Sequence, residues 1–170
     1  MIEIKNLSKQ FQNETEIDYC DMIFENGKSY MLLGASGCGK STLLRHLKTC
    51  LTPHGVLTGE ILFDGNPLSE TDERTQSQEI GFVLQSPENQ VVTDKVWHEL
   101  AFGLESLGLD TPTIRRRVAE VAAFFGIENW FYKNVAELSG GQKQLLSLAS
   151  VMAMQSFSHC SGFTWHLACS

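Results

Sequence analysis

The decisive stretch of this sequence is Gly34-Ala35-Ser36-Gly37-Cys38-Gly39-Lys40-Ser41-Thr42, which matches the pattern Gly-x-x-x-x-Gly-Lys-Ser/Thr. An apolar run at residues 29–33 precedes it, and residues 40–51 place leucines at helical spacing. The pattern therefore predicts a buried strand, a phosphate-binding loop and a helix in that order. A glycine-rich turn could match by chance, but strand, loop and helix all stand where a phosphate site requires them.

The residue types of this phosphate loop (residues 34–42) have distinct chemical roles. Glycines let the backbone curl so that successive N–H groups face phosphate oxygens, and the helix N-terminus adds its positive dipole. Lys40 would bridge the β- and γ-phosphates of a nucleotide, and the Ser41 hydroxyl would ligate Mg²⁺. Cys38 reads as a tolerated small residue. The loop therefore predicts a site for a magnesium nucleotide.

Length and charge exclude several classes of protein. The 170 residues, 42% of them hydrophobic, suit one modest domain with a core. The net charge of −7 and 13 scattered basic residues argue against binding to a nucleic-acid backbone. The triplet Arg115-Arg116-Arg117 is read as a solvated helix face. We therefore expect no nucleic-acid partner.

The sequence also indicates the cellular compartment of the chain. No run approaches the roughly 20 apolar residues that span a bilayer, and the N-terminus lacks the order of a signal peptide. The five cysteines form an odd set without a CxxC pair, so we expect reduced thiols. These features favour a cytosolic chain.

Alternation and turn residues predict the remaining elements. Strands are expected at residues 2–5, 22–24, 59–65 and 80–85. Residues 96–104 predict one helix, in which Val96, Leu100, Phe102 and Leu104 are the apolar positions. Residues 114–125 predict a second helix, with Thr111 as N-cap, Pro112 in the first turn and Gly126 at the end. Residues from about 90 to 137 thus form a helical insert in an α/β chain.

A second motif opens another predicted helix. Leu138-Ser139-Gly140-Gly141-Gln142 starts a segment that is apolar at helical spacing up to Met154. Ser139 is a good N-cap, and a capped helix with two glycines in its first turn is a second anion site. Alone, the motif would read as an ordinary helix start.

With both motifs present about a hundred residues apart, the chain resembles the nucleotide-binding subunits of ABC transporters, which carry a Walker A loop and an LSGGQ signature. The resemblance implies an α/β P-loop NTPase fold of the ABC type, with an antiparallel β subdomain and a helical insert. It implies an ATPase that uses ATP and Mg²⁺. Two subunits would clamp two ATP molecules, so the signature of one would contact the γ-phosphate held by Lys40 of the other. The signature residues are Ser139, Gly140, Gly141 and Gln142.

Two further positions gain roles from the resemblance. Gln85 ends the predicted strand at residues 80–85 and matches the family's Q-loop glutamine, which reaches Mg²⁺ and, with Lys40, serves catalysis. Phe11 falls where the family places an aromatic that stacks on adenine. An aromatic residue in a sheet-rich region can equally belong to the core, so both interpretations of Phe11 stay open.

Residues 85–92 and 100–105 resemble the energy-coupling factor branch of the family and its cobalt- and nickel-importer relatives. This branch implies a second ABC ATPase as partner, identical or different, and a transmembrane coupling protein gripped by a groove beside the Q-loop. It also implies import of a vitamin or metal ion. The chain would then lie in the cytoplasm, peripheral to the inner face of the cell membrane.

The resemblance covers residues 1–155, a partial ABC ATPase domain, and ends before Walker B. Residues 156–170 hold no acidic residue and form an atypical tail. A frameshift after Gln155 explains the tail better than a metal site built from His159, Cys160, His166 and Cys169. Without the Walker B acid and the catalytic Glu, hydrolysis by this chain should be poor or absent. The strand before the phosphate loop should also lack neighbours and expose apolar residues.

Other classes of function compete with the importer subunit. A soluble ABC ATPase shares both motifs, but it usually carries coiled-coil or tandem ATPase segments. A non-catalytic nucleotide-binding fragment would bind without turnover. A P-loop kinase is disfavoured by the signature helix.

Overall fold

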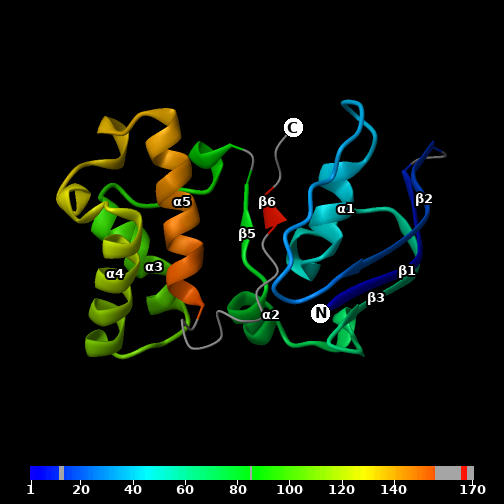
Figure 1. Cartoon of the computed structure of the whole chain (residues 1–170), viewed down its shortest axis with the longest axis horizontal. Helices are drawn as coiled ribbons and strands as arrows, with labels where there is room; N and C mark the ends of the chain where they lie inside the picture. Colours follow the sequence, from blue (N-terminus) through cyan, green and yellow to red (C-terminus); the bar gives the residue numbers. More distant parts are fainter. Residues whose placement is uncertain (12–13, 85, 156–165, 168–170) are drawn as a thin grey trace. The chain divides into compact units, whose positions relative to one another are not determined.

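The computed structural model of the chain describes residues 1–11, 14–84, 86–155 and 166–167 (Figure 1). The chain divides into two compact units, of which unit 1 includes Met1–Phe82 and unit 2 is Val83–Phe157. Gln85 and the side chains of the tail, including its suggested metal ligands, lie outside the described residues. The predicted domain boundary at residue 155 stays a prediction.

The elements follow one another in a strand-rich and then a helix-rich order. The strands are β1 (Ile2–Phe11), β2 (Glu14–Phe24), β3 (Val56–Phe63), β4 (Asn66–Pro67), β5 (Phe82–Val83) and β6 (His166–Leu167). The α-helices are α1 (Lys40–His46), α2 (Glu73–Glu79), α3 (Val96–Ser106), α4 (Thr111–Phe125) and α5 (Gly140–Met154). Short 3-10 helices lie at Thr49–Leu51, Leu68–Glu70, Pro87–Asn89, Glu128–Trp130 and Val135–Glu137.

Unit 1 is built on an antiparallel sheet with the strand order β2-β1-β3-β4. The central strand β1 pairs Ile4 with Met22 of β2 and with Ile61 of β3. Figure 1 shows these strands side by side. The antiparallel β subdomain that the family resemblance implies is therefore present.

An irregularity in β1 decides which side chains face the core. Asn6 has a φ of 48°, and the pairing of β1 with both neighbours shifts register around it. Ile2 and Ile4 are buried before the irregularity, and Leu7 and Lys9 are buried after it. A bulge adds one residue to the strand and so changes the phase of the alternation. This places a lysine on the core face of the sheet.

Unit 2 is a helical body with one apolar core. Residues Val96, Leu100 and Leu104 of α3 recur four residues apart and are fully buried. They belong to one apolar cluster with side chains of α4 and α5, such as Val118 and Leu146. The helix predicted at residues 96–104 is therefore confirmed, although Phe102 remains 47% exposed.

The strand predicted at residues 29–33 is wrong. These residues have no regular secondary structure, and Met31 and Leu33 are 81% and 83% exposed. A strand needs a neighbour for its backbone N–H and C=O groups, and within the described ranges no strand pairs with this segment. The exposure of Met31 and Leu33 agrees with the expectation that this segment exposes apolar residues.

Three smaller expectations need correction. The helix that begins at Lys40 ends at His46 rather than residue 51, because Lys48 is already extended. Of the described residues 80–84 in the predicted strand 80–85, only Phe82–Val83 form a strand. The N-cap of α4 is Asp110 rather than Thr111, because the Asp110 carboxylate accepts a hydrogen bond from the Thr113 N–H.

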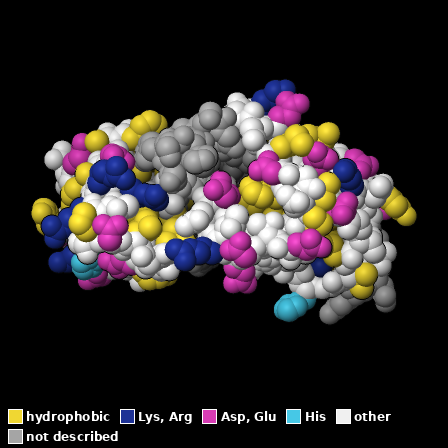
Figure 2. Space-filling model, turned by 90° about the horizontal axis from the view of Figure 1, so that it is seen from below, with side chains coloured by type: hydrophobic (Ala, Val, Ile, Leu, Met, Phe, Trp, Pro, Cys, Tyr) yellow, Lys and Arg dark blue, Asp and Glu magenta, His cyan; other side chains and the backbone are white. Residues whose placement is uncertain are grey.

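Neither the helices nor the surface charges of the described chain indicate a particular binding partner. Within the described part of the chain, no helix is both long and apolar enough to cross a membrane. On the face shown in Figure 2, Lys and Arg side chains lie among Asp and Glu side chains and form no continuous basic stripe.

Candidate nucleotide site

The phosphate loop depends on glycine where it meets the sheet. Gly39 is the N-cap of α1 and has a φ of +85°. A Cβ at this position would lie 2.7 Å from the carbonyl oxygen of Glu16 in β2. Only glycine avoids both the backbone strain and the clash. The loop is therefore anchored directly against β2.

The Lys40 ammonium contacts the backbone of its own phosphate loop. Its Nζ donates hydrogen bonds to the carbonyl oxygens of Gly34 (2.9 Å) and Ala35 (2.7 Å), and it lies 3.5 Å from the Cys38 Sγ. A Cβ at Gly34 would lie 2.7 Å from that sulfur atom. The Lys40 ammonium is thus bound by backbone carbonyl oxygens of its own loop, at exposed positions of unit 1.

The hydroxyl groups of the loop differ in their surroundings. Thr42 Oγ1 donates to the Glu16 carboxylate, which adds a second link between the loop and β2. Ser41 is exposed in the first turn of α1. Among the described residues, no group of three His, Cys, Asp or Glu side chains could hold a metal ion. A hydroxyl beside phosphate oxygens suits Mg²⁺, which needs few protein ligands.

Helix α1 carries a buried histidine beneath the loop. The His46 Nδ1 lies 2.6 Å from the carbonyl oxygen of Thr42. Burial lowers the pKa of His46, and the charge of nearby Lys9 lowers it further, against the opposing effects of the Thr42 carbonyl and Glu16. The imidazole is therefore neutral at pH 7, with Nδ1 as the donor.

Phe11 lies on the sheet close to the loop. It pairs with Glu14 of β2, and Lys9 pairs with Ile17. Residues 16 and 17 are the part of β2 that approaches Gly39. At a rise of about 3.4 Å per residue, Phe11 is on the order of 10 Å along the sheet from that contact. Phe11 is 39% exposed, so the structure does not place it in the core.

Sequence reasoning did not single out Lys9, which supports Phe11. Lys9 is only 1% exposed, and its Nζ donates a 2.8 Å hydrogen bond to the Pro53 carbonyl oxygen. The same Nζ lies 5.7 Å from the centroid of the Phe11 ring. The sequence offers no signal for this, because alternation from Ile2 and Ile4 puts Lys9 on the opposite face, and only the irregularity at Asn6 brings it to the core face.

The signature motif begins α5 in unit 2. Ser139 is the N-cap, and its hydroxyl accepts from the Gln142 N–H while the Gln142 side-chain oxygen accepts from the Ser139 N–H. A Cβ added at Gly140 or Gly141 would meet no atom within 4 Å. The packing of the described chain therefore does not require either glycine.

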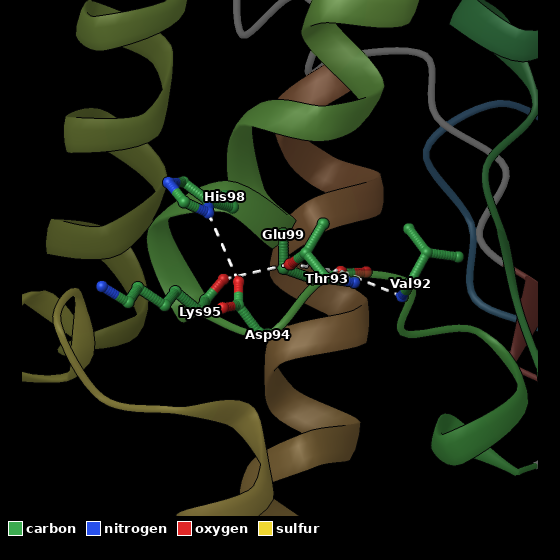
Figure 3. Close-up of polar contacts among 6 residues, drawn as sticks. All are labelled: Val92, Thr93, Asp94, Lys95, His98 and Glu99. Atoms are coloured by element: carbon green, nitrogen blue, oxygen red, sulfur yellow. Dashed lines mark hydrogen bonds and ion pairs between the residues drawn. The ribbon is translucent and has the colours of Figure 1, made fainter.

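A buried carboxylate organises the segment that follows Gln85 in the chain. Glu99 of α3 is 4% exposed, and its Oε2 accepts from the N–H groups of Val92 (3.1 Å) and Thr93 (3.0 Å) and from the Thr93 hydroxyl (3.0 Å). Figure 3 shows these contacts, with the Asp94–His98 pair on the outer side. Glu99 lies on the apolar face of α3, a signal that sequence reasoning missed.

This segment borders a pocket of about 700 Å³ in unit 2. The Val135 N–H donates to the Asp94 carbonyl oxygen, so residues on both sides of the pocket are linked. Three carboxylates and one ammonium line it, and the ammonium of Lys143 lies 3.5 Å from Glu88. The lining residues are Glu88, Val91, Thr93, Asp94, Asn134, Val135, Ala136, Glu137 and Lys143.

The predicted site residues thus fall into separate groups. Residues 34–42 and Phe11 belong to unit 1, and residues 139–142 belong to unit 2. Gln85 lies outside the described residues. The part of each group in binding nucleotide stays a prediction.

The glycine loop, its lysine, the antiparallel sheet and the capped signature helix define a nucleotide-binding domain of the ABC type. Residues 17–157 match the ABC transporter family, and the chain belongs to that family. Its fold is accordingly the α/β P-loop NTPase fold of these domains, in incomplete form.

The relatives agree with this assignment. The chain is 44% identical to an ABC transporter ATP-binding protein of Bacillus anthracis, over 90% of this chain and 28% of that protein. It is 36% identical to the cobalt import ATP-binding protein CbiO of Syntrophus aciditrophicus, over 91% of this chain and 55% of that protein. The chain is also 36% identical to the energy-coupling factor transporter ATP-binding protein EcfA1 of Streptococcus pneumoniae serotype 2, over 91% of this chain and 56% of that protein.

A solved structure shares the fold. The chain matches cbiO1 of Clostridium perfringens, part of the ABC transporter complex cbiONQ, with a TM-score of 0.77 and 29% identity. The match covers 90% of this chain and 61% of that one. The chain therefore spans between 28% and 56% of the length of these curated relatives.

Proposed function

We propose that this chain is the ATP-binding part of an importer's ABC-type ATPase subunit, of the energy-coupling factor or cobalt-import kind. The observation that carries the proposal is the phosphate loop, in which Gly39 packs against β2 and the Lys40 ammonium donates hydrogen bonds to two loop carbonyl oxygens. The names of the CbiO and EcfA1 relatives support the importer class. The transported substrate would be a metal ion or a vitamin.

Within this proposal, ATP binds to unit 1. The backbone N–H groups of residues 34–42 cradle the phosphates, and Lys40 exchanges its loop carbonyl partners for phosphate oxygens. The Ser41 hydroxyl ligates Mg²⁺ together with phosphate oxygens. The exposed Phe11 ring stacks on adenine, since it lies on the strand that pairs with the loop's neighbour β2.

The signature helix contacts the ATP held by a second ATPase subunit. The Ser139 oxygen accepts one hydrogen bond in the capping box, but its O–H can still donate, as can the Gln142 amide nitrogen. The space around Gly140 and Gly141 is open in this chain. Glycines at an exposed helix start suit a close approach of backbone to ligand.

The pocket of unit 2 receives the transmembrane coupling protein. Glu88, Asp94 and Glu137 outnumber the single ammonium of Lys143, so the pocket favours a basic segment. Glu99 fixes the backbone of the segment that borders it. Docking here would hold the chain in the cytoplasm, at the inner face of the membrane, and Gln85 would sense both this partner and Mg²⁺.

ATP binding and hydrolysis are separate properties of this chain. Catalysis in the family uses the Walker B acid and the following Glu. Residues 156–170 contain no acidic residue. We therefore expect the chain by itself to bind ATP without turnover.

Equilibrium dialysis with radiolabelled MgATP tests the nucleotide site. Lys40→Ala should weaken binding by about thirtyfold or more, because a charge-assisted phosphate contact is lost. Lys28→Ala is the matched control, since Lys28 is an exposed lysine that pairs with Glu25 before the loop. Equal binding by wild type and Lys40→Ala would contradict the proposal. Phosphate release measured in parallel should not exceed that of Lys40→Ala.

Charge reversal tests the partner site. The double substitution Asp94→Lys and Glu137→Lys should abolish recovery of the chain with membranes that carry the coupling protein, while MgATP binding is kept. Glu120→Lys, on the exposed face of α4, is the control for added positive charge. Unchanged membrane recovery of the double variant would exclude the pocket as the docking site.

A further inference from the structure

Lys9 is an unusual occupant of the core face of β1. The irregularity at Asn6 brings Leu7 and Lys9 to that face, and Lys9 is only 1% exposed. A buried ammonium is costly unless its hydrogen bonds and charge are compensated. Its position therefore calls for a specific reason.

The neighbours of the ammonium are well defined. The Lys9 Nζ donates to the Pro53 carbonyl oxygen at 2.8 Å and lies 5.7 Å from the centroid of the Phe11 ring. A cation within about 6 Å of an aromatic ring is attracted by its negative face. The chain at Gly55 closes over the lysine, because a Cβ at Gly55 would lie 3.1 Å from Lys9 Cε. Lys9 thus ties the Phe11 ring to the loop at residues 53–55.

We propose that Lys9 is a positioning residue for nucleotide binding, which holds the Phe11 ring as the platform for the base. The inference rests on the proposed ATP site of unit 1 and extends it to a residue outside the phosphate loop. Lys9 is too deeply buried to contact a phosphate itself. It acts through the ring, fixing its orientation from the covered side so that the exposed part can receive the adenine.

This role predicts an effect on the base and none on the phosphates. The lysine side chain belongs to β1, whereas the phosphate loop is anchored on Glu16 of β2 through Gly39. Losing the cation should loosen the ring and leave the loop intact. A lysine with a purely structural role would instead affect both parts of the nucleotide equally.

The experiment compares MgATP with magnesium tripolyphosphate, which has the phosphates and lacks the base, by isothermal titration of the full chain. Lys9→Met, which keeps the apolar stem and removes the charge, should weaken ATP binding by about threefold to tenfold. Tripolyphosphate binding should stay unchanged. Lys5→Met is the matched control, since Lys5 is an exposed lysine on the same strand.

Two further variants decide between the ring and the fold. Lys9→Gln keeps a donor for the Pro53 carbonyl oxygen and removes the charge, so its ATP binding should match that of Lys9→Met. If Lys9→Met does not fold, Lys9→Gln decides the result. Phe11→Leu should lower ATP binding by a similar factor. Adding Lys9→Met to Phe11→Leu should cause no further loss of ATP binding.

The outcomes separate this inference from the proposed function. If wild type prefers ATP to tripolyphosphate and both Lys9 variants keep that preference, the positioning role is overturned and the ATP site stands. If the Lys9 variants weaken both ligands equally, Lys9 is structural only and the inference is overturned. If wild type binds neither ligand, both the ATP site and the role of Lys9 fail.

Discussion

The phosphate loop in unit 1 and the signature helix in unit 2 use glycine for opposite reasons. A side chain at Gly39 would collide with the Glu16 carbonyl oxygen 2.7 Å away, so the loop's own packing demands glycine. A side chain at Gly140 or Gly141 would meet no atom within 4 Å. The packing of the described chain therefore does not explain the two signature glycines, and their contact with the ATP of a second subunit stays a proposal.

The polar side chains of the two regions differ in the same way. Lys40 donates hydrogen bonds to carbonyl oxygens of its own loop, and Thr42 donates to Glu16 of β2. Within the described part of the chain, the side chains of Ser139 and Gln142 bond only each other's backbone, in a capping box. The first region is assembled within one unit, whereas the second is an ordered helix start that faces open space. We therefore expect a substitution of Gly39 to lower stability and nucleotide binding together, and a substitution of Gly141 to impair function without lowering stability.

The largest effect is expected from Gly39→Ala. The new Cβ would be both strained at a φ of +85° and in collision with β2, so unfolding should become easier by about 2–4 kcal/mol. Nucleotide binding should be lost with it. Gly37→Ala is the matched control, because Gly37 has a φ of +81° with no atom within 4 Å of its added Cβ. Urea unfolding measures the loss of stability in both variants. A larger loss in Gly39→Ala than in Gly37→Ala would show that the clash with β2 adds to the backbone strain.

The next effect concerns the support of unit 2. Glu99→Ala removes the acceptor of three hydrogen bonds from Val92 and Thr93, which should cost about 2–3 kcal/mol of local stability. Amide hydrogen exchange at residues 92 and 93 measures it. Glu105→Ala, on the exposed side of the same helix, should leave that exchange unchanged. Equal exchange in the two variants would mean that Glu99 does not hold the segment.

A smaller loss is expected when the signature cap is removed. Ser139→Ala deletes the acceptor of the Gln142 N–H and should destabilise unit 2 by about 1 kcal/mol. Ser106→Ala, whose hydroxyl bonds a carbonyl oxygen near the end of α3, serves as the comparison. If the thermal melts of Ser139→Ala and Ser106→Ala coincide, the capping box contributes nothing measurable to the stability of unit 2.

The sharpest contrast with Gly39 comes from Gly141→Ala. Alanine favours the helix, so this variant should be more stable than wild type by about 0.5–1 kcal/mol. ATP binding to the single chain should not change, whereas ATP-dependent association with a second ATPase subunit should be lost. Sedimentation with and without ATP would test the association. A destabilised Gly141→Ala variant would remove the contrast between the two regions.

The smallest effect should appear only in acid. Burial lowers the pKa of His46 in the folded chain, so the unfolded chain binds a proton more readily. The stabilising contribution is fully present above the ordinary pKa of about 6.5 and is lost as pH falls below it. His46→Gln should flatten the pH dependence of unfolding below about pH 6.5.

The sequence alone was sufficient for the motifs and for most elements. The phosphate loop, the helix at Val96, the helix that ends at Gly126 and the signature helix capped by Ser139 all follow from local spacing and capping. These features depend on residues that are close together in the chain. Local patterns therefore predict them well.

Apart from Glu99, whose partners Val92 and Thr93 are close in the chain, the features that sequence reasoning missed depend on distant residues. Nothing in the loop itself reveals that Gly39 meets the Glu16 carbonyl oxygen, or that Lys9 reaches Pro53. Residues 29–33 have the composition of a strand but, among the described residues, no strand to pair with. Composition predicts that a segment can form a strand, whereas a strand forms only when a neighbour supplies its hydrogen bonds.

Amide hydrogen exchange with and without MgATP tests the central claim most directly. The account predicts that ATP protects the backbone amides of residues 34–42 in the single chain and leaves residues 139–142 unchanged. Lys40→Ala should abolish that protection. Protection at residues 139–142 without protection at residues 34–42, or no protection at either, would contradict the account.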